Sequence, residues 1–543
     1  MLARIVENWL TNAGELGYQA AFAQLLASEG YRILHAPVHH PFEHGKDTVA
    51  IAQDGSLHAF QLKGGDIGLA ELESMQGQLF ALAGTAVTYP GIEPPRPPDR
   101  VFLVTNGGIS APARDRLRSF NDANRQRGFP TIEAVERDQL VSRFVAAHET
   151  YLPSELENLN ELLQLVLAPG DEPFPTRHFA RVLWRIVSLP EKPPRPIDIR
   201  RALASATILT AYATGPWQRK ENHLGVAEGW LTLAFVALRA AEENELEDEH
   251  WQVSFQLARD SARAELRLLL DEAVAAQDLI IPDIVDGLVY PARAALVCGY
   301  CAAFYLSERE HASDSDFGPR IRTLLDRESE YMQATGEAGV ALLLLVATTW
   351  ELLGDPVRGG AIITQWARAL SAANQPGSQT AVPDPYHSIN DVLLHSVSAD
   401  SPIDEEEFAG EAHTLHIAID WLVRRGYRQL VEKLWPDITR LHFVEFRPSA
   451  PAMVLAEDDP EGHQETWAPA TPASWAKLVE QASSVEESSL PKVLWQHLYM
   501  LPYLPLLLPY RLTAPVAKAL DYMARKLCQV TFADDPANGS HVG

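Results

Sequence analysis

The hydrophobic pattern of this chain changes in kind between about residues 150 and 196, and this change limits the folds open to it. Before it, short β-type runs alternate with helical ones; after it, nearly every periodic stretch repeats at helical spacing. Prolines gather at the change, at positions 190, 193, 194 and 196, as in a stiff connector. With 543 residues, the chain is also too long for a single core.

We therefore predict an α/β domain over residues 1–150, a connector over 151–196 and an all-helical region over 197–543. Two polar, Pro-rich stretches, 374–402 and 447–472, resemble loops and could divide the helical region into two subdomains.

The first 145 residues predict a compact mixed sheet flanked by helices. Helices are expected over 15–29, 69–83 and 111–125, and strands over 31–36, 47–52, 57–63, 101–105 and 131–135. The Asp54-Gly55 pair between the second and third strands is a strong turn signal and predicts a hairpin. Because side chains alternate along a strand, Gln61 and Lys63 would share a face, and Asp47 on the partner strand could reach the same edge.

These side chains offer a set of oxygens suited to a hard cation. The Asp47 carboxylate, the Gln61 amide oxygen and the backbone carbonyl of Leu62 could hold Mg²⁺, with waters completing the shell. Lys63 would then lie beside a metal-bound water and a phosphate, where it can orient the water and offset charge on phosphorus. The other interpretation is an ordinary exposed hairpin whose polar side chains are solvated.

The order of these motifs resembles that of the Mrr-like restriction endonuclease family, within the PD-(D/E)xK nuclease superfamily. The resemblance covers about residues 15–145, with residues 132–140 fitting the family's closing strand and helix. The corresponding motifs here are Gly30-Tyr31, Gly45-Lys46-Asp47, Gln61-Leu62-Lys63 and Val101-Phe102-Leu103-Val104-Thr105.

The resemblance implies a restriction-endonuclease-like fold that cleaves phosphodiester bonds with Mg²⁺ or Mn²⁺, and DNA is favoured over RNA as the substrate. It also implies that the catalytic site contains Asp47, Gln61 and Lys63. One departure is that the family's first helix usually carries a glutamate where this chain has Gln19. Glu15 could substitute for it, because residues i and i+4 share a helix face.

Contacts to nucleic acid are expected from a few basic and small residues near the site. Arg114 and Arg118 share a helix face and could clamp phosphate, although a solvated helix face explains them equally well. Lys46 is a further candidate contact. Gly64 could let the backbone approach the substrate closely, or it simply ends the strand. Histidines crowd the same region and could line a groove or bind metal: His35, His39, His40, His44 and His58.

The charge is concentrated outside the first domain. Residues 1–150 hold 13 Lys+Arg and 17 Asp+Glu, a net of −4, so −23 of the total −27 belongs to the rest. Such an acidic surface repels phosphate backbones and favours a basic protein partner or self-association. Three cysteines favour a reducing cytoplasm, and Cys298 and Cys301, in an apolar run, are interpreted as core thiols. No membrane span or signal peptide is expected.

Nuclease heads fused to large helical bodies recur in bacterial defence against foreign DNA, which makes a defence effector the leading role, with the helical region sensing or assembling. Two alternatives remain. The head could be catalytically silent and only bind nucleic acid, or the helical region could be an interaction scaffold with a vestigial nuclease head.

Overall fold

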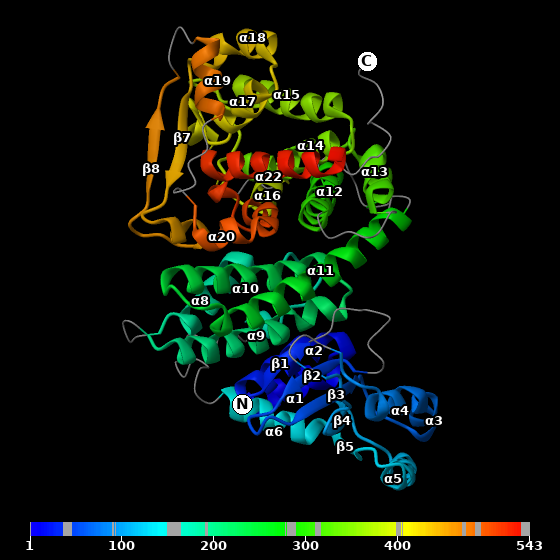
Figure 1. Cartoon of the computed structure of the whole chain (residues 1–543). Helices are drawn as coiled ribbons and strands as arrows, with labels where there is room; N and C mark the ends of the chain where they lie inside the picture. The colour runs from blue at the N-terminus through cyan, green and yellow to red at the C-terminus, as the bar shows by residue number, and fades with distance from the viewer. Residues whose placement is uncertain are drawn as a thin grey trace. The chain divides into compact units, whose positions relative to one another are not determined.

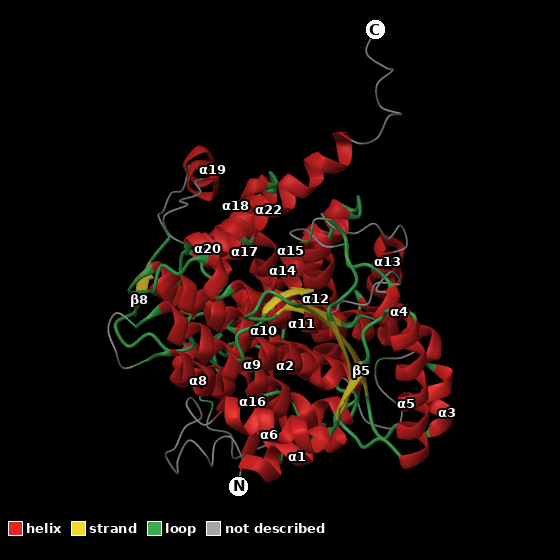
Figure 2. Ribbon diagram, turned by 60° about the horizontal axis from the view of Figure 1, so that its bottom comes forward, coloured by secondary structure: helices red, strands yellow, loops and turns green. Residues whose placement is uncertain are grey.

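The computed structural model describes residues 2–35, 46–88, 92, 94–148, 164–189, 194–276, 279, 289–309, 317–397, 403, 405–469, 474–483 and 490–533. The chain divides into two compact units, Met1–Glu265 and Leu266–Gly543. Both are shown in Figure 1. Helices predominate among their elements, as the colouring of Figure 2 makes clear.

A five-stranded mixed sheet lies at the centre of the first 150 residues. Its strands follow the order of the sequence: β1 (Arg32–His35), β2 (Thr48–Ile51), β3 (Leu57–Lys63), β4 (Arg100–Thr105) and β5 (Ile132–Val135). The first three pair antiparallel, whereas β3–β4 and β4–β5 pair parallel. All five strands were predicted. The turn at Asp54-Gly55 is also confirmed, because Gly55 has a φ of 82°, which glycine adopts at no steric cost.

Helices cover both faces of this sheet. On one face lies α2 (Glu15–Ser28), whose Phe22 ring is 5.4 Å from that of Phe60, between centroids. On the other face Ala59 and Leu103 share a buried cluster with residues of three helices, α3 (Leu69–Ser74), α4 (Gln76–Gly84) and α5 (Ala111–Gln126). The helix predicted over 69–83 is therefore two helices, which meet at Met75.

The same unit extends well beyond the sheet. It also holds α1 (Leu2–Asn12), α6 (Arg137–His148), α8 (Thr176–Val187), α9 (Pro196–Arg219), α10 (His223–Glu243), η1 (Asp248–His250) and part of α11 (Gln252–Ala275). Trp9 of α1 packs on Tyr212 of α9 with ring centroids 4.4 Å apart. Helix α9 is buried around most of its circumference because α2 lies against it as well as α8 and α10.

The predicted connector over 151–196 is corrected within its described part. Residues 176–187 form α8, which buries Phe179, Val182, Leu183 and Ile186. The prolines on either side of this helix led to the prediction of a connector, although the apolar residues between them repeat at helical spacing. The helices from residue 196 to about 265 pack with the sheet, so they do not form a separate body.

The second unit is mainly helical but not entirely so. Its helices are α12 (Val289–Glu308), α13 (Phe317–Glu328), η2 (Glu337–Gly339), α14 (Val340–Leu352), α15 (Pro356–Ala373), α16 (Ile389–Val397), η3 (Glu405–Phe408), α17 (Leu415–Arg424), α18 (Arg428–Ile438), η4 (Pro451–Leu455), α19 (Trp475–Ser483), α20 (Lys492–Gln496), η6 (Leu498–Tyr503), α21 (Leu504–Leu507), η7 (Pro509–Arg511) and α22 (Ala514–Ala533).

The expectation of an all-helical region is wrong in one place, because this unit holds a three-stranded sheet. Strands β6 (Glu411–Ala412) and β7 (His442–Arg447) pair parallel, and β7 pairs antiparallel with β8 (His463–Trp467). Strand β8 is mostly exposed and polar, so it is held by backbone pairing and lacks the alternation of apolar residues that marks a half-buried strand.

Two helices, α10 and α12, are long and apolar enough to cross a membrane by length and composition. Of their most apolar stretches, 83% and 72% are buried inside the protein, which is how core helices of a folded domain behave. Cys298 and Cys301 on α12 are free and buried, which confirms their interpretation as core thiols. Burial raises the pKa of Cys301 to about 12, so its reactive thiolate form is disfavoured.

Candidate functional site

Asp47 and Gln61 meet across the β2–β3 pair. Thr48 pairs with Phe60, so Asp47 stands opposite Gln61 one position beyond the last pair. Oδ2 of Asp47 accepts two hydrogen bonds of 2.6 Å, one from Nε2 of Gln61 and one from the backbone N–H of Leu62. The Asp47 N–H donates to the Phe60 carbonyl at 2.9 Å. The carboxylate is therefore fixed at the point where the two strands begin to pair.

Lys63 ends β3 and shares a sheet face with Gln61, because side chains two positions apart on a strand point the same way. Its carbonyl accepts a 2.8 Å hydrogen bond from the hydroxyl of Tyr18, which also lies 3.3 Å from the Val104 carbonyl. Tyr18 is fully buried on α2 and so ties that helix to the ends of β3 and β4. The sequence analysis missed this residue; its only signal was a hydroxyl within an otherwise apolar helix face.

Gln61 carries a buried acceptor without a donor. The side chain is 3% exposed, and no donor among the described residues reaches its Oε1. A buried polar atom in this state costs about 1–3 kcal/mol. An amide oxygen beside a carboxylate is a ligand that a hard divalent cation accepts, and the Leu62 carbonyl adds a third oxygen nearby. This donor set fits Mg²⁺ in chemical type, although it supplies a single negative charge.

Helix α2 adds no acidic ligand among its described side chains. Gln19 is half-buried on α2 and makes no hydrogen bond to Asp47 or Gln61. The side chain of Glu15, its proposed substitute, lies outside the described residues. Of the two positions considered on this helix, Gln19 is therefore not brought to Asp47.

Lys46 lies in the protein interior, which does not fit the predicted contact with nucleic acid. Its side chain is 5% exposed, and its Nζ donates a 3.1 Å hydrogen bond to the Ala81 carbonyl near the end of α4. Burial lowers the pKa of Lys46 to about 8. The Ala81 carbonyl also accepts the Thr85 N–H, and it lies at the C-terminal end of the helix, where the partial negative charge of the helix dipole attracts a cation. Gly64 is half-buried and directly follows Lys63.

The basic cluster on α5 is paired with acidic side chains. Arg114 lies 2.7 Å from Glu136 and also donates to the Ile109 carbonyl. Arg118 lies 3.0 Å from Asp115, and both are 72% exposed. Exposed pairs of this kind contribute little, about 0–1 kcal/mol, so a phosphate could displace the carboxylates. The structure leaves both interpretations of this face open.

The histidine group is only partly described. His58 lies on the sheet face opposite Gln61, where its ring contacts the Tyr31 hydroxyl at 3.2 Å and the Ser56 hydroxyl at 2.9 Å. Burial lowers its pKa, so the neutral ring is favoured. This position excludes it as a ligand beside Asp47. His39, His40, His44 and the side chain of His35 lie outside the described residues.

The loop after Lys63 is held by residues that the sequence analysis did not single out. Asn106 accepts a 2.6 Å hydrogen bond from the Gly65 N–H and donates to the carbonyls of Leu10 and Ala13. The backbones approach so closely that a Cβ on Gly107 would lie 2.3 Å from the Gly65 carbonyl carbon. The Asn106-Gly107-Gly108 run directly after an apolar strand was the signal available.

A second group of metal-type ligands lies in the same unit. The ligand atoms of Glu247, Glu249 and His250 lie within 4.8 Å of one another. The two glutamates are exposed, and exposed acidic groups of this kind are common without an ion. We assign no metal to this group.

No family model, curated protein or solved structure matches this chain. Its function is therefore inferred from the side chains themselves.

Proposed function

We propose that the first 150 residues form a restriction-endonuclease-like head that hydrolyses DNA phosphodiester bonds with Mg²⁺ or Mn²⁺. The observation that carries the proposal is the buried Oε1 of Gln61, which has no donor among the described residues and lies beside the Asp47 carboxylate, where β2 begins and β3 ends. The mixed parallel and antiparallel pairing of the five strands, with helices on both faces, supports it further.

Asp47, Gln61 and the Leu62 carbonyl would hold the cation, which supplies Lewis acidity and lowers the pKa of a bound water. Lys63 orients the attacking water and offsets negative charge on the phosphate. Tyr18 holds the Lys63 backbone in place through its 2.8 Å hydrogen bond to the carbonyl. The hydrogen bond from Gln61 Nε2 fixes the carboxylate and leaves Oε1 available.

One observation favours a second candidate, a head that binds nucleic acid without cleaving it. Oδ2 of Asp47 already accepts two N–H donors, and it is the amide nitrogen of Gln61, not its oxygen, that faces the carboxylate. A cation at this site would require the carboxylate to bind through its other oxygen or the amide to rotate. If the hydrogen bonds to Asp47 stay intact, no cation binds there, and the head would bind DNA through the α5 arginines alone.

We further propose that the protein acts in the bacterial cytoplasm as an effector against foreign DNA, with the acidic helices sensing a signal or assembling copies. The net charge of −23 outside residues 1–150 supports a basic protein partner or self-association, because such a surface repels DNA. The alternative role, an interaction scaffold, would show as a stable complex without nuclease activity under any metal.

A cleavage assay tests the proposed activity. Supercoiled, linear and single-stranded DNA are incubated with the purified chain and Mg²⁺, Mn²⁺ or EDTA. We expect metal-dependent nicking by the wild type, none in EDTA, and a loss of about a hundredfold or more in Lys63→Ala. Lys220→Ala removes an exposed lysine far along the chain and serves as the control. Equal cleavage by wild type and Lys63→Ala would exclude this site as the source.

A further inference from the structure

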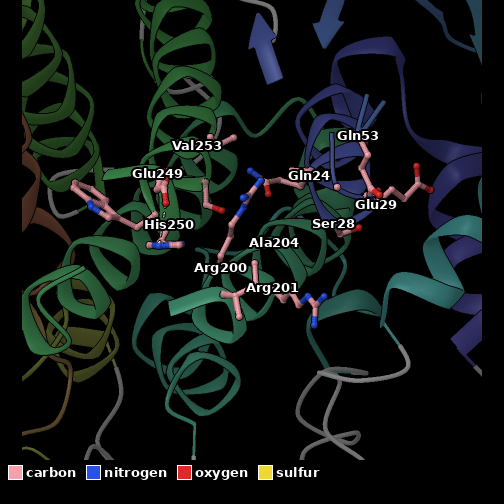
Figure 3. Close-up of a pocket in the computed structure, with 15 residues that line it drawn as sticks. Gln24, Ser28, Glu29, Gln53, Arg200, Arg201, Ala204, Glu249, His250 and Val253 are labelled. Atoms are coloured by element: carbon pink, nitrogen blue, oxygen red, sulfur yellow. Dashed lines mark hydrogen bonds and ion pairs between the residues drawn. The ribbon is translucent and has the colours of Figure 1, made fainter. Parts of the chain in front are cut away.

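A small cavity of about 170 Å³ lies within the first unit, apart from the Asp47 site (Figure 3). Its walls come from the end of α2, the turn between β2 and β3, the start of α9, η1 and the start of α11. The volume is close to that of a cavity that holds one six-membered aromatic ring, roughly 150 Å³. A ligand of this size is a small metabolite or a terminal group of a larger one.

Three polar groups in this cavity have no partner among the described residues. Gln24 is 2% exposed, and its Nε2 finds no acceptor. Nδ1 of His250 is buried and likewise without a partner. The Arg200 guanidinium forms no hydrogen bond or ion pair with a described residue. In Figure 3, Arg200 extends from α9 toward the Gln24 amide. Buried polar groups are normally satisfied, so this convergence points to a ligand.

The charge around the cavity favours an anion. Glu29 is neutralised by Arg143 through two hydrogen bonds of 2.8 and 2.5 Å. Glu249 is 74% exposed and lies 3.4 Å from Nε2 of His250. Arg201 has Asp198 at 4.0 Å. Because Glu249 is exposed to solvent, the half-buried Arg200 is the positive charge on the cavity wall that lacks an opposite charge in the described part of the chain.

The cavity wall is also held in a fixed form. Gly30 has a φ of 91°, and a Cβ there would lie 2.0 Å from Nε2 of Gln53. That amide donates a 3.1 Å hydrogen bond to the Glu29 carbonyl. The hairpin turn is thereby fastened to the end of α2. A wall that is rigid before binding lowers the entropy cost of binding.

We propose that this cavity binds the phosphate-bearing end of a small phosphomonoester such as a pentose phosphate. The planar guanidinium of Arg200 matches two phosphate oxygens, and the Gln24 amide donates to a third. His250 and the Ser28 and Ser254 side chains contact the hydroxyl groups of the ligand. Because α2 and α9 both line the cavity, the ligand would stabilise the packing of the sheet-bearing part against α9.

Calorimetric titration of the full chain tests this inference and is independent of nuclease activity. The probes are ribose 5-phosphate, ribose and succinate, all at the same ionic strength. We expect ribose 5-phosphate to bind and to raise the melting temperature, and the other two to do neither. Binding of succinate as tightly as ribose 5-phosphate would overturn the phosphate assignment, and binding of none of the three would overturn the site.

Two variants and one control locate the binding. Arg200→Ala should weaken ribose 5-phosphate binding by about tenfold or more, because a hydrogen bond to a charged group is lost. Arg219→Ala removes an exposed arginine from the other end of α9 and should leave binding unchanged. Gln24→Met keeps the side-chain shape but removes the amide, so it should also weaken ribose 5-phosphate binding. This variant tests the site if Arg200→Ala fails to fold. Undiminished binding in a folded variant would contradict the proposal.

Discussion

The side-chain amide of Gln61 donates a 2.6 Å hydrogen bond to Oδ2 of Asp47, while its own oxygen, Oε1, has no donor among the described residues. The pair thus holds a carboxylate in place and presents a buried acceptor next to it. In a protein interior such an acceptor is costly unless something positively charged or hydrogen-bonding meets it.

The first prediction concerns this pair. Gln61→Glu would set two carboxylates against each other, so the free energy of unfolding in EDTA should fall by about 1–3 kcal/mol. Added Mg²⁺ should restore it, because a second negative charge strengthens cation binding. Melting temperatures with and without Mg²⁺ measure both effects. Gln61→Met, which removes the hydrogen bond without adding charge, should be destabilised but gain nothing from Mg²⁺, and an equal response of the two variants would argue against a cation site.

A second prediction concerns the buried Tyr18 hydroxyl. Tyr18→Phe leaves the carbonyls of Lys63 and Val104 without this donor, so the unit should lose about 1–2 kcal/mol of stability. The same change should lower the cleavage rate severalfold with little change in DNA affinity, because it loosens Lys63 without removing it. Calorimetry and single-turnover cleavage supply the two readouts. A variant that loses stability but cleaves at the wild-type rate would show that Tyr18 is only structural.

A third prediction follows from the buried ammonium of Lys46. Its pKa is about 8 in the folded chain and near the ordinary value of 10.5 when unfolded. Between these values the unfolded chain binds the extra proton, so stability from this group rises with pH. Relative to Lys46→Met, the wild type should therefore gain about 1 kcal/mol between pH 7.5 and 9.5, less than the full shift implies because this range ends below the unfolded pKa. A stability difference that does not change with pH would refute the buried ammonium.

A fourth prediction separates the two interpretations of α5. If Arg114 and Arg118 contact phosphate, replacing both with alanine should weaken DNA binding severalfold and lower the salt dependence by about 1–2 in slope. Arg125→Ala removes an arginine paired with Asp122 on the last turn of the same helix and serves as the reference. Binding measured by fluorescence anisotropy at several salt concentrations gives both values. An unchanged slope would leave the cluster as a solvated face.

Local patterns were sufficient to predict the sheet. Each strand carries either alternation or an apolar run, and the Asp54-Gly55 turn fixes how β2 and β3 meet, so the encounter of Asp47 with Gln61 followed from register alone. Long-range packing was not predictable in this way. Lys46 lies beside Asp47 in sequence, but its burial depends on the end of α4, 35 residues away.

The same limit applies to the division of the chain. Trp9 contacts Tyr212, which is far away in sequence, and no local pattern predicts this contact. The sequence therefore did not indicate that α9 belongs to the same unit as the sheet. The proposed phosphate cavity could not be predicted for the same reason, since Gln24, Arg200 and His250 come from three separate elements. Each of them is a polar residue on a helix, and no sequence motif marks it as part of a site.

The central claim, a cation held between Asp47 and Gln61, is tested most directly by titrating Mn²⁺ into the purified chain and into Asp47→Asn. We expect the wild type to bind one ion more per chain than Asp47→Asn, and Asp115→Asn, which changes an exposed aspartate, to bind as the wild type does. Identical Mn²⁺ binding by the wild type and Asp47→Asn would contradict it.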